Sequence, residues 1–104
     1  MHAYLDVTDG PFYLGRLSGR APVAEHMHDT SWEVLAALDA AGTFVLAGKE
    51  QRLGPRQIVF VPPATLHEWK PDPGSNLVAI QLYDPPGPEQ RFKKLASDAA
   101  DAGR

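Results

Sequence analysis

The sequence is organised around one polar stretch, residues 26–33, which reads His26-Met27-His28-Asp29-Thr30-Ser31-Trp32-Glu33. In an extended segment, side chains two residues apart point to the same face, so His26 and His28 project together while Met27 turns away. The polar residues that follow are turn formers, so we expect a hairpin that folds Glu33 back toward the two histidines. This stretch therefore predicts two imidazoles and one carboxylate in position to bind a single metal ion.

A further candidate ligand, His67, follows an apolar run over residues 58–61 and a rigid turn that contains Pro62 and Pro63. The chain has four histidines, and three of them lie in these two places. An isolated His-x-His pair usually marks an exposed strand edge, but that interpretation leaves the returning carboxylate and the later histidine unexplained. We therefore predict one metal site, and its expected ligands are His26, His28, Glu33 and His67.

These residues carry a family resemblance. The pattern His-x-His, four residues, Glu, and later Pro-x-x-x-x-His resembles the two motifs of the cupin superfamily over roughly residues 19–83. The resemblance implies a small double-stranded β-helix, or jelly-roll barrel, that holds one metal ion through three histidines and one glutamate. Arg56 stands at a Gly-Asp position of the family pattern and Ala64 replaces a frequent glycine, so we expect the loops there to differ.

The whole chain, residues 1–104, is predicted to form one all-β domain. Its ten prolines and nine glycines divide 104 residues into short segments, which favours strands over long helices. The expected strands are residues 4–8, 12–17, 22–28, 32–38, 43–46, 50–53, 57–61, 66–70 and 76–83, so that the barrel spans about residues 4–84. The spacing of apolar residues after Pro88 predicts a short helix over about residues 88–99.

For three of these segments the sequence also predicts which structure or which buried face they have. Residues 34–38 have good helix formers, but turn signals on both sides favour a strand. Residues 57–61 are apolar at nearly every position, which indicates a strand buried on both faces. The segment 76–83 alternates, and we expect Val78, Ile80 and Leu82 to point inward and Gln81 outward.

Composition limits the cofactors and partners. The net charge is -3 with scattered charges, so we expect no nucleic-acid partner and no membrane association. No apolar stretch approaches the roughly 20 residues of a membrane span, and no signal-peptide core is recognisable, so we expect a cytoplasmic location. Because the chain has no cysteine, the imidazole and carboxylate set suits one divalent transition metal ion: Fe, Mn, Ni, Zn, Co or Cu.

Candidate pocket residues follow from the ligands by the two-residue repeat of a strand. Leu35 shares a face with Glu33, and Trp69 shares a face with His67. Arg16 would line the pocket and hold an anionic substrate if its face of residues 12–17 points inward, although an exposed arginine is the more common case.

A site of this kind with open coordination positions indicates a metal-dependent enzyme for a small oxygenated molecule, with Glu33 also a candidate catalytic residue. The reaction would be a dioxygenation of an enolisable or phenolic compound, or an isomerase or lyase reaction of a sugar-type acid. The alternative is a non-catalytic module that binds or senses a small ligand. The sequence does not specify the native metal or substrate. We also expect a homodimer, because apolar residues such as Tyr13, Val59 and Val61 supply more apolar surface than one small core needs, and because the family resemblance implies one.

Overall fold

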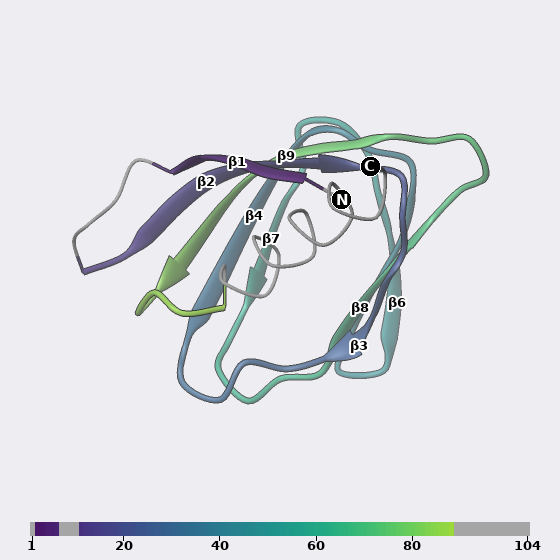
Figure 1. Ribbon diagram of the computed structural model, residues 1–104. Coiled ribbons are helices and arrows are strands. Elements are labelled where there is room, and N and C mark those ends of the chain that lie inside the picture. Colours follow the sequence, from purple (N-terminus) through teal and green to yellow (C-terminus); the bar gives the residue numbers. More distant parts are fainter. Residues whose placement is uncertain (1, 7–10, 89–104) are drawn as a thin grey trace, which may run out of the picture.

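The computed structural model describes residues 2–6 and 11–88, which form an antiparallel all-β domain (Figure 1). The described residues form the strands β1 His2–Asp6, β2 Tyr13–Gly19, β3 Val23–His26, β4 Trp32–Asp39, β5 Gly42–Leu46, β6 Lys49–Leu53, β7 Ile58–Val61, β8 His67–Pro71 and β9 Leu77–Asp84. They contain no helix that is long and apolar enough to cross a membrane. The helix predicted after Pro88 lies outside the described residues.

Two sheets face each other and enclose the core (Figure 1). The first sheet has the strand order β1-β2-β9-β4-β7 and the second has the order β3-β8-β5-β6. Every pairing is antiparallel. This is the double-sheet jelly-roll arrangement that the sequence predicted.

The core lies between the inner faces of the two sheets. Along β2, β4 and β9 every second residue is buried, as expected for strands with one face toward the core. The buried apolar cluster consists of Tyr13, Leu17, Leu35, Ala37, Ala40, Phe44, Leu53, Val59, Val61, Trp69, Leu77, Ala79 and Tyr83. Tyr13, Val59 and Val61 are thus core residues, so the surplus of apolar surface that we expected from them does not exist.

The structure corrects the predicted orientation of β9. Leu77, Ala79, Gln81 and Tyr83 point inward, whereas the alternate residues, including Ile80, are only partly buried on the outer face. Gln81 is tolerated inside because its amide nitrogen, Nε2, donates a hydrogen bond to Tyr83 Oη at 3.1 Å. Both faces of this central strand are apolar, so the sequence pattern could not fix which face is inward.

Strand β7 is buried on one face only, which corrects the expectation of a strand buried on both faces. Val59 and Val61 are in the core, but Ile58 and Phe60 are 57% and 60% exposed. The physical reason is the position of β7 at the edge of the five-stranded sheet.

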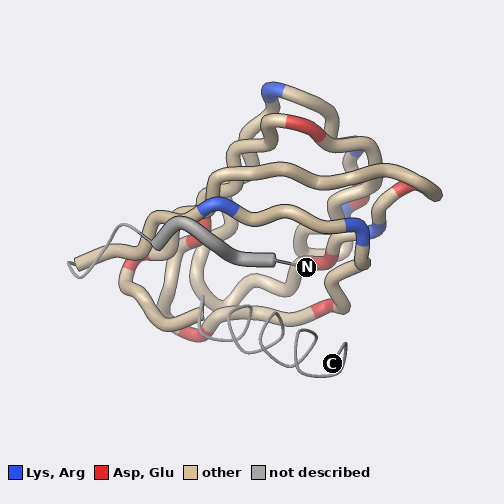
Figure 2. The backbone as a smooth tube through the Cα atoms, turned by 45° about the horizontal axis from the view of Figure 1, so that its top comes forward, with Lys and Arg blue, Asp and Glu red and all other residues tan. Residues whose placement is uncertain are grey.

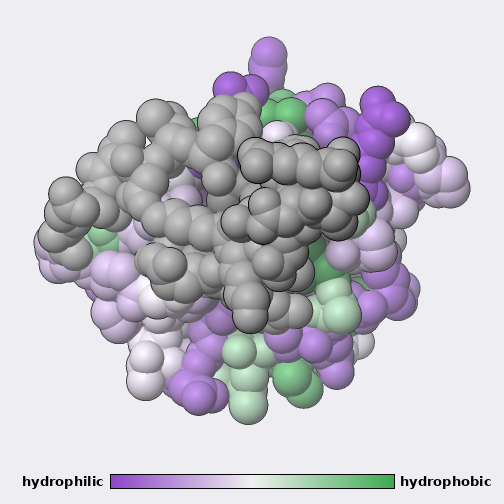
Figure 3. Space-filling view, in the orientation of Figure 1, coloured by the Kyte–Doolittle hydropathy of each residue, from purple (hydrophilic) through white to green (hydrophobic). Residues whose placement is uncertain are grey.

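Charged residues of both signs are interspersed along the described backbone (Figure 2). On the face seen in Figure 3, the visible apolar residues form small groups among polar ones.

Candidate metal centre

The candidate ligands come from both sheets. His26 ends β3 and His67 begins β8, and these two residues are direct cross-strand partners. Glu33 lies on β4 of the opposite sheet, where it pairs with Val61 and Tyr83. His28 lies in the loop between β3 and β4. The expected hairpin is therefore wrong, because β3 and β4 belong to different sheets and do not pair with each other.

Backbone contacts fix two of the imidazole rings. His26 Nδ1 lies 2.7 Å from the Ala24 carbonyl oxygen, and His67 Nδ1 lies 2.9 Å from the Thr65 carbonyl oxygen. A carbonyl accepts only, so each Nδ1 carries a proton. In the neutral ring, the form that binds a metal ion, the lone pair is then on Nε2; in the protonated ring Nε2 also carries a proton. Histidine ligands of metal ions usually have this arrangement, in which the second ring nitrogen donates to a backbone carbonyl.

The loop that carries His28 is tied to the turn before His67. The backbone N–H of Ala64 donates to the His28 carbonyl oxygen at 2.7 Å. Ala64 has a φ of 56° and Arg56 a φ of 65°, which is the left-handed region that glycine adopts most easily. These are two positions where the sequence departs from the cupin pattern, and the backbone there keeps a conformation that suits glycine.

The three imidazoles converge, and two of them contact Glu33. His28 Nε2 lies 3.1 Å from Glu33 Oε1, and His67 Nε2 lies 3.4 Å from the same oxygen. The candidate ligand atoms of the three histidines all lie within 4.8 Å of one another. Two ligands on opposite sides of one ion lie at most about 4.2 Å apart, from bond lengths of about 2.1 Å. The three imidazoles therefore fit one divalent ion after small rotations of the rings, and Glu33 lies beside two of them.

Glu33 is held as a carboxylate. It is buried, with only 4% of its surface exposed, and burial alone would raise its pKa. The hydrogen bonds and charges of His28 and His67 outweigh this effect and lower the pKa of Glu33 from 4.5 to about 2. An ionised carboxylate beside imidazole nitrogens is a chemistry that transition metal ions bind well.

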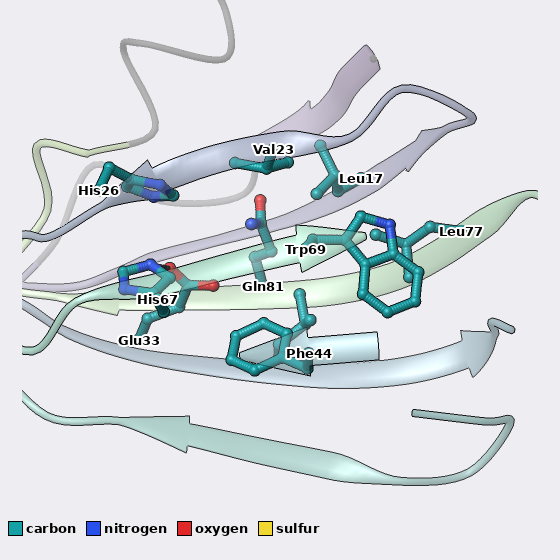
Figure 4. A pocket seen from close by; sticks show the side chains of 10 residues that line it. Leu17, Val23, His26, Glu33, Phe44, His67, Trp69, Leu77 and Gln81 are labelled. Carbon is teal, nitrogen blue, oxygen red and sulfur yellow. Dashed lines mark ion pairs between the residues drawn. The ribbon is translucent and has the colours of Figure 1, made fainter. Parts of the chain in front are cut away.

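A pocket opens between the sheets beside this centre (Figure 4). Its walls are formed by Leu17, Val23, His26, Glu33, Leu35, Phe44, His67, Trp69, Leu77 and Gln81. Leu35 and Trp69 thus lie where the two-residue repeat placed them. His28 is near the centre but is not among these wall residues.

Arg16 is not part of the pocket, which corrects the expectation that it could line it. Tyr13, Gly15 and Leu17 occupy the inner face of β2, so Arg16 belongs to the opposite face. Sequence reasoning also missed Gln81 as a pocket residue, because the phase of β9 was assigned the wrong way round. An amide in the middle of an otherwise apolar strand was the available signal.

Comparisons with known proteins agree with this fold. The model of the AraC-like ligand binding domain family matches residues 13–93. KdgF from a Halomonas species has a similar structure, with a TM-score of 0.69 and 21% identity over 83% of this chain and 80% of that chain.

Two further solved structures show the same fold. A predicted oxalate decarboxylase from Thermotoga maritima has a TM-score of 0.61 and 19% identity, over 72% of this chain and 65% of the other. The cupin domain of Cnp3 from Schizosaccharomyces pombe has a TM-score of 0.70 and 10% identity, over 88% and 68%. No curated protein matches the sequence.

Proposed function

We propose that this chain, which belongs to the family of AraC-like ligand-binding domains and is a small cupin domain, binds one divalent transition metal ion and a small oxygenated molecule beside it. The proposed ligands are His26, His28, Glu33 and His67. The observation that supports this most strongly is the convergence of three imidazoles at the edge of a pocket, where two of them also contact one buried carboxylate.

The proposed activity is that of a metal-dependent enzyme. A bound divalent ion would act as a Lewis acid on a carbonyl or hydroxyl oxygen of the substrate. The protein supplies the rest: two rings held by backbone carbonyls, a buried anionic ligand, and mostly apolar walls. The reaction classes are a dioxygenation of an enolisable or phenolic compound, or an isomerase or lyase reaction of a sugar-type acid.

Glu33 is better suited to hold the ion than to move protons. A general base works best when its pKa is near the working pH, and the pKa of Glu33 is about 2. Proton transfer by Glu33 remains a prediction, and we assign this residue first as an anionic ligand.

A second candidate function is a non-catalytic ligand-binding or sensing module. It is favoured by the match to a family that is described as ligand-binding. It is also favoured by the pocket walls, because away from the metal ligands the polar side chains there are Gln81 and the indole N–H of Trp69. In this case the same centre would hold a small molecule without changing it.

One experiment separates these two candidates. Metal-loaded protein is incubated with a panel of diketones, catechols and sugar acids, and both binding and turnover are followed, including oxygen uptake. The matched control is the His28→Ala variant, in which one ligand is lost but every wall residue is retained. Turnover that the variant lacks supports the enzyme, whereas binding without turnover supports the sensing module. If the metal-loaded protein neither binds nor converts any compound of the panel, the proposed function is contradicted.

We also propose that two copies pair through the outer face of the five-stranded sheet. Leu38 on β4 and Ile58 and Phe60 on β7 are 55%, 57% and 60% exposed there. Strand β7 is an edge strand, and exposed edges with apolar neighbours tend to associate.

A further inference from the structure

Two polar groups in the pocket take no part in the metal centre. The indole Nε1–H of Trp69 is buried and has no hydrogen-bond partner among the described residues, although Trp69 is only 3% exposed. Gln81 is also 3% exposed, and its Nε2 donates to Tyr83 Oη. That bond leaves the carbonyl oxygen of Gln81 as an acceptor. A buried donor without a partner costs stability, so such a group in a pocket points to a ligand atom that completes it.

The positions of these groups set the length of a ligand that reaches from the metal centre to Trp69. His67 and Trp69 are two residues apart on the inner face of β8, which corresponds to about 6.6 Å along a strand. Figure 4 shows Trp69 beyond His67, with its ring nitrogen on the edge nearer Leu17 and Leu77, and Gln81 between the two from the facing sheet. A molecule that binds beside the histidines and reaches Trp69 therefore passes Gln81.

The walls define the chemistry of the molecule between these points. Leu17, Val23, Leu35, Phe44 and Leu77 are apolar, and none of the described residues that line the pocket is Lys or Arg. The cavity is also small, with room for one or two water molecules, so a ligand can enter only if it is compact and the apolar side chains of the walls shift. A large polyhydroxylated or doubly charged molecule would leave its polar groups without partners in such a site.

We propose that Gln81 and Trp69 are the specificity-determining residues of the pocket. They select a compact molecule that has oxygen donors for the metal at one end, an apolar body, and an uncharged hydroxyl or carbonyl oxygen at the other end. That oxygen accepts from Trp69 Nε1–H, and a hydroxyl in reach of Gln81 donates to its carbonyl oxygen. This inference rests on the proposed metal-centred function and narrows its substrate class toward phenolic or diketone-like molecules and away from sugar acids.

The test uses three catechols that differ only opposite the two metal-binding hydroxyls: 4-methylcatechol, 3,4-dihydroxybenzyl alcohol and 3,4-dihydroxybenzoate. Binding to the Zn²⁺-loaded protein is measured by calorimetry, because zinc has no redox chemistry that would oxidise the catechols. We expect the benzyl alcohol to bind roughly ten-fold more tightly than the methyl compound, from one or two additional hydrogen bonds. The benzoate should bind more weakly than the benzyl alcohol, since no cation faces its carboxylate.

Variants identify the residues responsible. Gln81→Met and Trp69→Phe replace each polar group by an apolar side chain. Each variant should reduce the preference for the benzyl alcohol over 4-methylcatechol several-fold. The matched control is Gln51→Met, the same exchange at an exposed glutamine of β6 that does not line this pocket. The control should keep the preference of the parent.

Equal affinity of the parent for the methyl and hydroxymethyl compounds would overturn the inference. A preference that survives in both pocket variants would also overturn it. If stoichiometric Zn²⁺ is bound but none of the three catechols binds, this inference fails and the metal centre stands. If no Zn²⁺ is bound at all, the proposed function itself fails.

Discussion

Replacing Gly42 by alanine should destabilise the domain strongly. A Cβ atom at Gly42 would lie 2.5 Å from the Lys70 carbonyl oxygen, 2.6 Å from Cη2 of Trp69 and 2.9 Å from Cα of Pro71. Comfortable contacts between carbon atoms are about 3.5–4.0 Å, so β8 would have to move by roughly 1 Å. Two of the three atoms are backbone, and Gly42 is paired with Pro71 in the sheet, so this movement is resisted.

The expected cost is that of overpacking a core, about 1–3 kcal/mol in the free energy of unfolding. For a domain of this size, each kcal/mol lowers Tm by roughly 4–8 °C. The assay is urea unfolding of the metal-free proteins, with midpoints compared at constant slope. The matched control is Gly54→Ala, since its Cβ would have only Gln57 Oε1 nearby, at 3.8 Å, and we expect a change within about 0.5 kcal/mol. Equal stability of the two variants would refute this packing between β5 and β8.

Four further predictions follow from other contacts. Ser31→Ala should lower the free energy of unfolding by about 0.5–1.5 kcal/mol in urea titrations, because buried Ser31 donates to the carbonyl oxygen of Pro85, an exposed residue, at 2.6 Å. An unchanged midpoint would contradict this role. Ala64→Gly should be neutral to slightly stabilising, because relief of about 1–2 kcal/mol of left-handed strain at a φ of 56° exceeds or matches the entropy cost of glycine; a clear loss in thermal melts would speak against it. In metal-free protein the pKa of Glu33 is lowered from 4.5 to about 2, so its ionised form stabilises the fold above about pH 4.5 and this contribution disappears as the pH falls toward 2. The difference in free energy of unfolding between the parent and Glu33→Gln, measured at several pH values, should therefore shrink on acidification. A difference that does not depend on pH would exclude this linkage. Phe60→Glu should convert the proposed dimer to a monomer in sedimentation velocity, and a monomeric parent would reject the dimer.

Much of the fold was predictable because short-range signals and the core pattern agree. Turn residues placed most strand boundaries within a few positions, and β4 is a strand although residues 34–38 favour a helix. Its inward residues Glu33, Leu35 and Ala37 follow the two-residue repeat, and burial of that face in the sheet overrides local helix propensity.

The errors have one physical origin, which is that strand pairing is not a local property. Residues 26–33 look like a hairpin, but His26 pairs with His67, 41 residues later, and not with the strand that follows it. The predicted inward face of β9 was wrong for the same reason. In a central strand with two apolar faces, pairing with the neighbouring strands determines which face points inward. The role of Gln81 depended on that phase, and the exposure of Phe60 depended on the edge position of β7.

The most direct test of the metal centre is the metal content of the purified protein and its four single-alanine variants at His26, His28, Glu33 and His67. Each protein is exposed to an equimolar divalent metal, passed through gel filtration, and measured by elemental analysis and by thermal melting. We predict about one ion per chain in the parent and much less in every variant, because each change removes one of four ligands. The metal-free variants should still unfold cooperatively, since the core between the sheets does not depend on the ion. Stoichiometric metal in all four variants, or none in the parent, would contradict the site.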